Sequence, residues 1–434
     1  NKTPRGEIMK RALDLGLPKH LQAYIISQDY EKYTALEHAT WRFVLRQQSK
    51  LLGKKAHASY LQGIKETGLL ISRIPRIEEI DEHLKRFSWR AVCVRGFIPP
   101  LAFLEFQSQN IMPIARDIRT LENIVYTSAP DIIHEAAGHA PFVAREDYRT
   151  FLEKYALVAT KAFFSREDIE LYEAIRKASD MKENKDYTAK EVRQAESDLE
   201  VSQKSIDWVS EANKLSRFYW WTAEYGLIGK KDKFEIYGAG LLSSLFESFE
   251  SFNFPPEKKD LSLKCLDQAF DITEPQPQLF VAKDFSQLTD LLGEFEETLA
   301  FSKGGKSAVE TACQADLPIC LELDQRITLV GDIKSYELDQ QKNISFLSWR
   351  KVKIITPAIK LGSFDLNHKT LIPIGRWQGT KKNPSKLTDK ELSDLDFNKN
   401  KEVELIFTSG FRVKGTLKDW LRNKEGELIS LFWK

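Results

Sequence analysis

The sequence predicts a mainly α-helical domain with short strands, followed by a separate β-rich domain. Apolar residues recur at helical spacing over 36–52 and again over 76–87. Beyond a flexible, glycine-containing stretch at 301–308, the pattern changes to short runs rich in β-branched and aromatic residues. We therefore place the helical domain at 1–305 and the β-rich domain at 310–434.

The composition excludes several classes of protein. The chain carries 64 Lys+Arg against 63 Asp+Glu, so it has no bulk charge to attract nucleic acid or anionic lipid. No apolar stretch approaches the roughly 20 residues that span a bilayer, and no signal-peptide pattern opens the sequence. The 4 cysteines are too few and too scattered for a disulfide framework. We expect a globular, cytoplasmic protein with neither a nucleic-acid nor a membrane partner.

Three segments of the chain carry more specific expectations. The charged stretch 166–207 is predicted to be an inserted, solvated helical hairpin. Two adjacent prolines within 91–110 predict a loop with an apolar lining and no helix. The polar run 381–402 is expected to be a long exposed loop.

The β-rich domain is expected to contain six strands, with a hairpin turn at 408–410 and no internal repeat. The last strand runs into Lys434, which suggests that the chain is cut within or beside this domain. The predicted strands are 326–331, 349–357, 370–375, 403–407, 411–417 and 427–433.

The start of one helix is well signalled in the segment SAPDIIHEAAGH. Ser128 is suited to the N-cap, and Pro130 suits the first turn because proline lacks the N–H that a helix start leaves unpaired. Asp131 lies three residues after Ser128, in a capping-box arrangement.

Two histidines in this helix carry the strongest chemical signal. The chain has only 7 histidines, yet His134 and His139 lie five positions apart with Glu135 between them. A lone histidine is more often structural, but such a pair is typical of a metal site. On an ideal helix, residues five apart point about 140° from one another. Both rings can reach one metal only if the helix is distorted, so we predict an irregularity between Glu135 and Pro141.

A third ligand is expected from another apolar helix. Glu224 lies in FYWWTAEYGLI, where a buried carboxylate must be paired, protonated or metal-bound. The simpler alternative is an ion pair with Arg217. Two histidines and one carboxylate form a facial triad, which leaves open positions on Fe(II). A zinc hydrolase with Glu135 as its general base remains an alternative.

The segments YTSAPDIIHEAAGHAPF, FYWWTAEYGLI and YGAGLLSS resemble the aromatic amino acid hydroxylases. These are monooxygenases that use iron and a tetrahydropterin. The resemblance covers roughly 74–301 and implies that fold for the helical domain, with Fe(II), a tetrahydrobiopterin-like cofactor, O2 and an aromatic amino acid as its ligands. The implied iron ligands are His134, His139 and Glu224.

The resemblance also implies a substrate site. Arg119, which alone would be taken for a surface charge, falls where the family binds the substrate carboxylate. Trp220 precedes Glu224 by one helical turn, so the substrate ring is expected to pack on its indole. Tyr219 matches a catalytic aromatic residue near the metal. The implied substrate-binding set is Arg119, Thr127, Pro130, Trp220, Ser243 and Ile272.

The pterin site is implied by the segment RGFIPPLAFLEF. Phe103 takes the position of the ring that stacks on the pterin. Gly96 and Ile98 match backbone contacts, and Glu135 matches a catalytic carboxylate that reaches the pterin through water. Pro100 departs from the family's pattern, because a serine often stands there, and Pro113 replaces a histidine.

The expected substrate is phenylalanine. Trp220 resembles the phenylalanine and tyrosine enzymes, and the aliphatic Ile272 stands where tyrosine enzymes have an aspartate. Tyrosine and tryptophan hydroxylation are the alternatives within the family. Nothing in the resemblance covers 310–434, so a protein that is chiefly a binding module is a further alternative.

Overall fold

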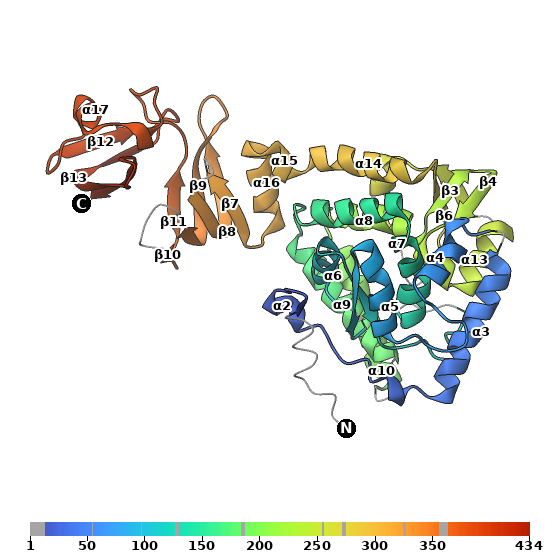
Figure 1. The fold of residues 1–434 in the computed structure, drawn as a ribbon. Coiled ribbons are helices and arrows are strands. Elements are labelled where there is room, and N and C mark those ends of the chain that lie inside the picture. Colours follow the sequence, from blue (N-terminus) through green and yellow to red (C-terminus); the bar gives the residue numbers. More distant parts are fainter. Residues whose placement is uncertain are drawn as a thin grey trace. The chain divides into compact units, whose positions relative to one another are not determined.

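The chain divides into two compact units (Figure 1). The first extends to Ala162 and resumes over Glu167–Leu299, and the second holds Phe163–Arg166 and Ala300–Lys434. The computed structural model describes residues 14–53, 55–96, 98–125, 130–183, 187–253, 256–270, 275–323, 327–355 and 363–434.

Helices form most of the first unit. Those that precede the candidate site are α2 (Lys19–Gln22), α3 (Ala35–Leu52), α4 (Ser59–Glu66), α5 (Ile77–Leu84) and α6 (Pro100–Ser108), with short 3-10 turns at Tyr30–Lys32 and Lys85–Phe87. Those that follow are α7 (Ala140–Val143), α8 (Glu146–Ala159), α9 (Arg166–Glu183), α10 (Ala189–Lys204), α11 (Glu211–Tyr219), α12 (Ala239–Ser243), α13 (Leu245–Asn253) and α14 (Phe285–Thr298), with a 3-10 turn at Leu263–Asp267.

Two small sheets complete this unit. Parallel strands β1 (Arg90–Val94) and β2 (Ile111–Ala115) flank α6. The second sheet has the order β4-β3-β6-β5 and is mixed, because β3 pairs antiparallel with β4 but parallel with β6. Its strands are β3 (Leu227–Lys230), β4 (Lys233–Ile236), β5 (Glu257–Asp260) and β6 (Gln278–Ala282).

The prediction of a loop without a helix over 91–110 is wrong, because α6 occupies Pro100–Ser108. The proline pair was interpreted as a helix breaker. Pro100 instead begins the helix, where a missing N–H costs nothing and the fixed φ of proline suits helical geometry. This helix carries Phe103, the predicted pterin-stacking residue.

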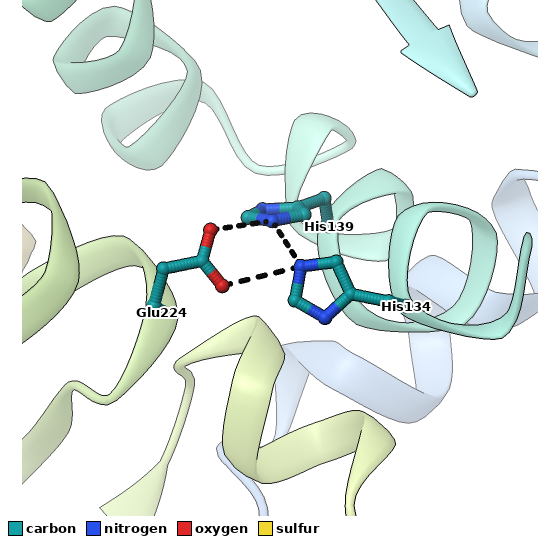
Figure 2. A group of neighbouring side chains, drawn as sticks. All are labelled: His134, His139 and Glu224. Atoms are coloured by element: carbon teal, nitrogen blue, oxygen red, sulfur yellow. Dashed lines mark hydrogen bonds and ion pairs between the residues drawn. The ribbon is translucent and has the colours of Figure 1, made fainter. Parts of the chain in front are cut away.

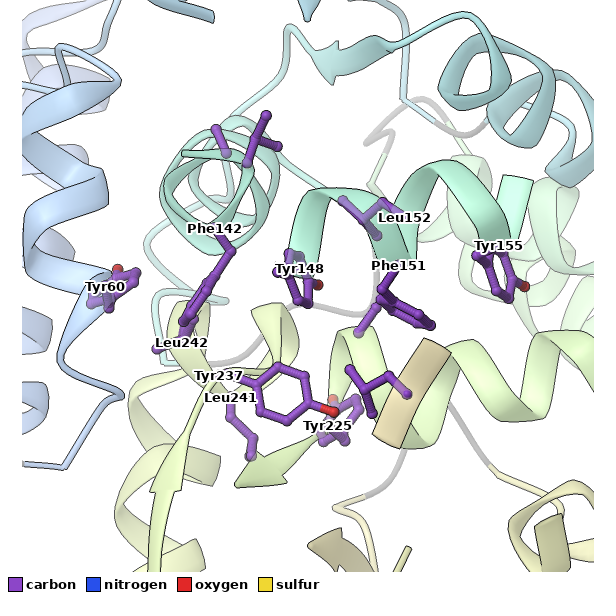
Figure 3. Close-up of a cluster of buried hydrophobic side chains, with 14 of the residues drawn as sticks. Tyr60, Phe142, Tyr148, Phe151, Leu152, Tyr155, Tyr225, Tyr237, Leu241 and Leu242 are labelled. Carbon is purple, nitrogen blue, oxygen red and sulfur yellow. The ribbon is translucent and has the colours of Figure 1, made fainter. Parts of the chain in front are cut away.

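Aromatic side chains fill the core beside the candidate site (Figure 3). Phe142 from α7 contacts Tyr148 from α8 with ring centroids 5.3 Å apart, and Phe285 from α14 lies 5.5 Å from Tyr148. Tyr237 closes the group at 5.2 Å from Phe285. All four rings are almost completely buried, so this cluster fixes α7 and α8 relative to the segment that follows β4.

The segment 166–207, predicted to be a helical hairpin, contains the helices α9 and α10, and Lys177 of α9 forms an ion pair with Asp198 of α10. Thr188 caps α10 through a capping box with Glu191. Most described side chains of α10 are exposed, and Ala195 is the one described residue of α10 that is buried. The described part of the chain has no helix long and apolar enough to cross a membrane.

In the second unit, two helices precede a sheet. These elements are α15 (Ala300–Lys303), α16 (Gly305–Ala315), β7 (Ile319–Leu323), β8 (Ile327–Leu338), β9 (Ile344–Ile355), β10 (Ser363–Leu366) and β11 (Thr370–Pro373). The sheet is antiparallel with the order β10-β9-β8-β7, and β11 also pairs with β9. A second sheet, β12-β13-β14, follows and contains β12 (Glu402–Ile406), β13 (Arg412–Arg422) and β14 (Leu428–Trp433).

Strands occur in all six predicted segments, and the turn at 408–410 is confirmed, with Gly410 at φ +83°. The long exposed loop expected at 381–402 is wrong. It contains a 3-10 turn at Pro384–Lys386 and helix α17 (Asp389–Asp394), and its Leu392 is completely buried. The polar composition concealed the few apolar residues that anchor this segment.

Candidate metal centre

The predicted irregularity in the histidine helix is confirmed as a π-helical segment, His134–His139. The Ala140 N–H donates to the Glu135 carbonyl, five residues earlier. A π-helix takes more residues per turn than an α-helix, so side chains five apart come close to alignment. This distortion brings His134 and His139 together, with their ring centroids 4.9 Å apart.

The cap of this helix differs from the prediction. Asp131 is itself the capping residue, because its Oδ1 accepts a hydrogen bond from the His134 N–H at 3.0 Å. Ser128, the predicted cap, lies outside the described residues. Pro130 directly precedes Asp131 and is partly buried.

Glu224 lies in a second π-helical segment, Trp220–Glu224, which continues from α11. The Tyr225 N–H donates to the Trp220 carbonyl at 2.9 Å and closes this wide turn. Arg217 donates to the Leu266 carbonyl, and no ion pair of Arg217 with Glu224 is found among the described side chains. The alternative pairing considered from the sequence is therefore wrong.

Three donor atoms meet at the centre (Figure 2). The two histidine Nε2 atoms are 3.2 Å apart, and they lie 3.2 Å (His134) and 3.0 Å (His139) from the two oxygens of Glu224. Adjacent ligands at about 2.1 Å from one metal are themselves about 3 Å apart. The side chains are largely buried, with exposed fractions of 17%, 3% and 12% in the order His134, His139, Glu224. The donor set fits one metal ion bound on one face.

Ser243 sets the protonation pattern of His134. Its hydroxyl donates to the Ala239 carbonyl at 2.8 Å, so it accepts from the His134 Nδ1–H, which is 3.0 Å away. The lone pair of the ring then lies on Nε2, the atom that faces Glu224. A hydrogen bond of this kind orients a metal-binding imidazole.

The pKa values of the buried carboxyl groups of Glu224 and Glu135 are shifted in opposite directions. Burial by itself would raise the pKa of Glu224, but the facing His139 and His134 hold this pKa well below its usual value. Burial raises the pKa of Glu135 to about 8, against the attraction of His139. The Glu135 Oε2 and the His139 Nδ1 are buried without a hydrogen-bond partner in the described part of the chain. The Glu135 Oε2 is therefore a buried acceptor without a partner among the described residues, whereas the His139 Nδ1 belongs to the side of the ring that does not face Glu224.

Arg119 is a buried residue and not the surface charge that it resembles when taken alone. Its Nε and Nη2 donate to the two oxygens of Asp131 at 2.8 Å each, and Nη1 donates to the Ser243 carbonyl at 2.8 Å. The side chain is 1% exposed. Burial would raise the pKa of Asp131, but Arg119 holds it below its usual value. Ser243 thus contacts both the proposed carboxylate-binding arginine and a candidate metal ligand.

Trp220, in the same π-helical segment as Glu224, belongs to a group of packed aromatic rings. Its indole stacks on Phe270 at 4.3 Å with an interplanar angle of 10° and lies 4.7 Å from Tyr225. The indole N–H donates to the Gln276 Oε1 at 3.0 Å. This hydrogen bond fixes the ring plane, as an amphipathic side chain in a binding wall requires.

The predicted pterin-stacking residue reaches the centre through Tyr219. The Tyr219 ring lies 6.2 Å from His139 with an interplanar angle of 29°, and Phe103 meets Tyr219 edge-on at 6.4 Å. Burial raises the pKa of Tyr219 well above its usual value, so its hydroxyl stays protonated. Two aromatic rings therefore connect α6 to the centre.

For four other predicted site residues, the structure gives little or no evidence of a role in binding. Gly96 has φ +33°, and Ile98 is partly buried near the start of α6. Thr127 and Ile272 lie outside the described residues, so their substrate contacts stay predictions.

Three buried polar residues at the site were not predicted in these roles. Asp131 holds Arg119, Gln276 holds Trp220, and Glu247 accepts from the Tyr225 hydroxyl at 2.9 Å. Burial raises the pKa of Glu247 to about 7, against its hydrogen bonds to Tyr225 and Ser244. Only Glu247 gave a usable signal in the sequence, since a carboxylate in the apolar run LLSSLFESF must be accommodated within the fold.

Comparison with known proteins agrees with this geometry. The sequence profile of the family described as "Biopterin-dependent aromatic amino acid hydroxylase" matches residues 25–174 and 192–303. Its gap falls within the α9–α10 hairpin, and its end precedes α16. The match includes all three donors of the centre.

Individual relatives show the same extent of similarity. Phenylalanine-4-hydroxylase of Mesorhizobium japonicum is 28% identical over 65% of this chain and 89% of the relative. The enzyme of that name from Pseudomonas aeruginosa is 29% identical over 60% and 84%. Chromobacterium violaceum phenylalanine hydroxylase, solved with iron(III) and 7,8-dihydrobiopterin, shares the fold with a TM-score of 0.50 at 24% identity, covering 67% of this chain and 90% of that one.

No support for the zinc hydrolase emerges from these comparisons. The profile spans more than half of the chain and includes the whole centre, so this chain belongs to the biopterin-dependent aromatic amino acid hydroxylases.

Proposed function

We propose that this chain is an iron-dependent phenylalanine 4-monooxygenase, which converts L-phenylalanine to L-tyrosine with O2 and a tetrahydropterin. The observation that carries the proposal is the face of three donors, His134, His139 and Glu224, with ligand atoms within 4.8 Å of one another. Two imidazoles and one carboxylate are a preferred ligand set of Fe(II) in oxygen-activating enzymes. The preference for phenylalanine is supported by the bacterial relatives, which are named phenylalanine-4-hydroxylase at 25–29% identity.

Different residues of the chain are proposed to position the metal ion and the pterin. Iron and a reduced pterin, when bound, supply the chemistry that activates O2. His134 offers Nε2 because Ser243 accepts from its Nδ1–H, and Glu224 supplies the negative charge that favours a cation. Phe103, at the start of α6, is proposed to stack on the pterin, and the buried Glu135 is proposed to contact it through water.

Arg119 and Trp220 are proposed to orient the amino acid. Of five guanidinium N–H groups, Arg119 uses Nε and one each on Nη1 and Nη2 for Asp131 and Ser243. The remaining N–H groups suit a substrate carboxylate. Because Asp131 already neutralises the charge of Arg119, this contact would orient the substrate carboxylate more than it would attract it electrostatically. Trp220, fixed by Gln276, offers an aromatic surface for the ring.

The test is reconstitution of metal-free protein with Fe(II) under anaerobic conditions. Tetrahydrobiopterin, O2 and either phenylalanine, tyrosine or tryptophan are then supplied, and products are identified by mass spectrometry. We expect tyrosine from phenylalanine, with matching pterin consumption, and no product from the zinc-loaded control. Hydroxylation of tyrosine or tryptophan in place of phenylalanine would overturn the substrate assignment.

A further inference from the structure

A closed set of four side chains lies beside the candidate metal centre and includes Trp220, the residue proposed to contact the substrate ring. The other three are Tyr225, which ends the π-helical segment, Glu247 of α13, and Gln276, which shortly precedes β6. Each side chain or main-chain group of the set contacts two of the others. Two separate routes therefore lead from the carboxyl of Glu247 to the indole of Trp220.

The first route passes through the ring of Tyr225. The Tyr225 hydroxyl donates to the Glu247 Oε2 at 2.9 Å. Its ring lies 4.7 Å from the indole of Trp220 with an interplanar angle of 34°. The ring is also closely packed, because a Cβ added to Gly240 would meet its Cε2 at 2.9 Å and its Cζ at 3.0 Å. Glu247 thus holds the hydroxyl end of a ring that supports the indole.

The second route passes through Gln276. Burial raises the pKa of Glu247 to about 7, and the hydrogen bonds that act against this shift include one from the Gln276 main-chain N–H. The side-chain Oε1 of the same glutamine accepts from the Trp220 indole N–H at 3.0 Å. The carboxyl of Glu247 therefore interacts with the backbone of the residue whose side chain holds the indole.

Few other contacts orient the indole of Trp220. Phe270 stacks on it at 4.3 Å with an interplanar angle of 10°. Two rings and one hydrogen bond thus hold the indole in place. The ring of Tyr225 and the hydrogen bond from Gln276 both depend on Glu247, so this one carboxyl acts on two of the three contacts.

Burial makes these polar contacts specific. Tyr225 is 4% exposed, Glu247 5% and Gln276 7%, whereas Trp220 is only partly buried. An apolar side chain at position 247 would avoid the cost of burying a carboxyl, but it would leave the Tyr225 hydroxyl without its acceptor. Buried polar groups that are matched to one another favour a single arrangement of the side chains around them.

We propose that Glu247 is a positioning residue for the substrate ring, because it holds both neighbours that orient the indole of Trp220. The proposal rests on the proposed function, since it takes Trp220 as a wall of the phenylalanine site. Glu247 acts through its neighbours and needs no contact with the substrate. Loss of its carboxyl should therefore weaken the binding of phenylalanine and leave the binding of iron and pterin unchanged.

Four variants of the full chain separate the hydrogen bonds from the packing. Tyr225→Phe removes only the hydroxyl and keeps the ring. Glu247→Leu removes the acceptor of both routes, whereas Glu247→Gln keeps a carbonyl oxygen on a side chain of the same length. Tyr30→Phe is the matched control, because the Tyr30 hydroxyl also donates to a carbonyl within the fold, that of Ile74 at 2.7 Å.

The orientation of Trp220 can be measured without turnover. Protein labelled with 5-fluorotryptophan should give a fluorine NMR signal for each of its 9 tryptophans, and Trp220→Phe identifies the signal of Trp220. We expect this signal to shift or broaden in Tyr225→Phe and Glu247→Leu and to stay in place in Glu247→Gln and Tyr30→Phe. An unchanged signal in Glu247→Leu would overturn the proposal.

The effect on the substrate is measured by steady-state kinetics of the iron-loaded protein. We expect the KM for phenylalanine to rise about three- to tenfold in Tyr225→Phe and at least as much in Glu247→Leu, and to change less than about twofold in Glu247→Gln. The KM for tetrahydrobiopterin and the iron content should stay constant. A parallel rise in both KM values, or loss of iron, would indicate general damage to the fold and would overturn the proposal.

A double variant tests whether Tyr225 and Glu247 act through one hydrogen bond. Introduced into Glu247→Leu, the change Tyr225→Phe should alter the KM for phenylalanine less than about twofold. Effects that multiply in full would contradict the first route. If the unmodified protein hydroxylates no phenylalanine, the proposed function fails by itself, and the fluorine signal still decides whether Glu247 positions Trp220.

Discussion

The candidate metal centre and the two β modules of the second unit, β7–β9 and β12–β14, are held together in different ways. At the centre, individual polar side chains have particular partners, as Ser243 has in His134, and two helices depart from regular geometry to bring the donors together. The modules are instead stabilised by long antiparallel strand pairings and by apolar packing, and the two hairpins have equivalent strand registers. The difference indicates that function in this chain depends on single side chains, whereas the fold of the second unit depends on distributed packing.

The largest expected effect is at the centre itself. Glu224→Ala removes the one negative charge among the three donors, leaving two histidine nitrogens that a cation would meet alone. We expect loss of stoichiometric iron, measured by elemental analysis, and a fall in hydroxylation of at least about 10³-fold, or about 4 kcal/mol. Glu200→Ala, on the exposed α10, is the control. Unchanged iron content would show that Glu224 is not a ligand.

The modules allow a comparison of equivalent residues, because Trp349 pairs with Ile333 as Trp433 pairs with Leu417. Trp349→Ala removes a completely buried side chain and should lower the free energy of unfolding by about 3–5 kcal/mol. Trp433→Ala should cost less than half as much, because Trp433 is only partly buried. Denaturation with guanidinium, followed by fluorescence, measures both changes. Equal losses would contradict the difference in burial between Trp349 and Trp433.

Glu247 links stability to pH in the first unit. Its pKa is raised from 4.5 to about 7 by burial, so the folded protein holds the proton more tightly than the unfolded chain. The stability that this carboxyl contributes is therefore complete below about pH 4.5 and is lost as the pH rises through about 7. Glu247→Gln should thus stabilise the protein by up to about 3 kcal/mol at pH 8 and change little at pH 4.5.

Unfolding by urea at both pH values tests this prediction. Glu250→Gln, on the same helix, serves as the control, since its side chain is only partly buried. A stability change of the same size at both pH values would show that the hydrogen bond to Tyr225, and not the proton, carries the effect.

The centre could be predicted in large part from the sequence, because rare residues with a diagnostic spacing lie close together. The five-residue spacing of His134 and His139 required a distorted helix, and the π-helical segment confirms it. Asp131 and Gln276 were missed in their roles because their partners, Arg119 and Trp220, are distant in sequence. A hydrogen bond across the fold leaves no local pattern.

The fold of the two modules was much less predictable from the sequence than the metal centre. Alternation of apolar residues identified six strands but missed β7 and β10, and the turn at 408–410 predicted one pairing, that of β12 with β13. The other pairings and the equivalence of the hairpins were not predicted. Register depends on turns and bulges, and the register shifts between Ile333 and Ser335 and between Leu417 and Asp419 have no local sequence signature. Helix α17 was missed because a core needs only a few apolar anchors, such as Leu392, within a polar segment.

The smallest expected effect concerns a residue that touches no metal ion in the proposal. Ser243→Ala removes the acceptor for the His134 Nδ1–H, so the ring is free to rotate or to adopt the other tautomer. Loss of such a partner typically weakens metal binding about 10–100-fold. Ser251→Ala is the matched control, because Ser251 is also a buried serine, and it donates to a carbonyl of its own helix away from the centre. Iron affinity should be measured by competition with a chelator. If both variants bind iron equally well, the orientation of His134 does not depend on Ser243, and the π-helical backbone alone must hold the ring in place.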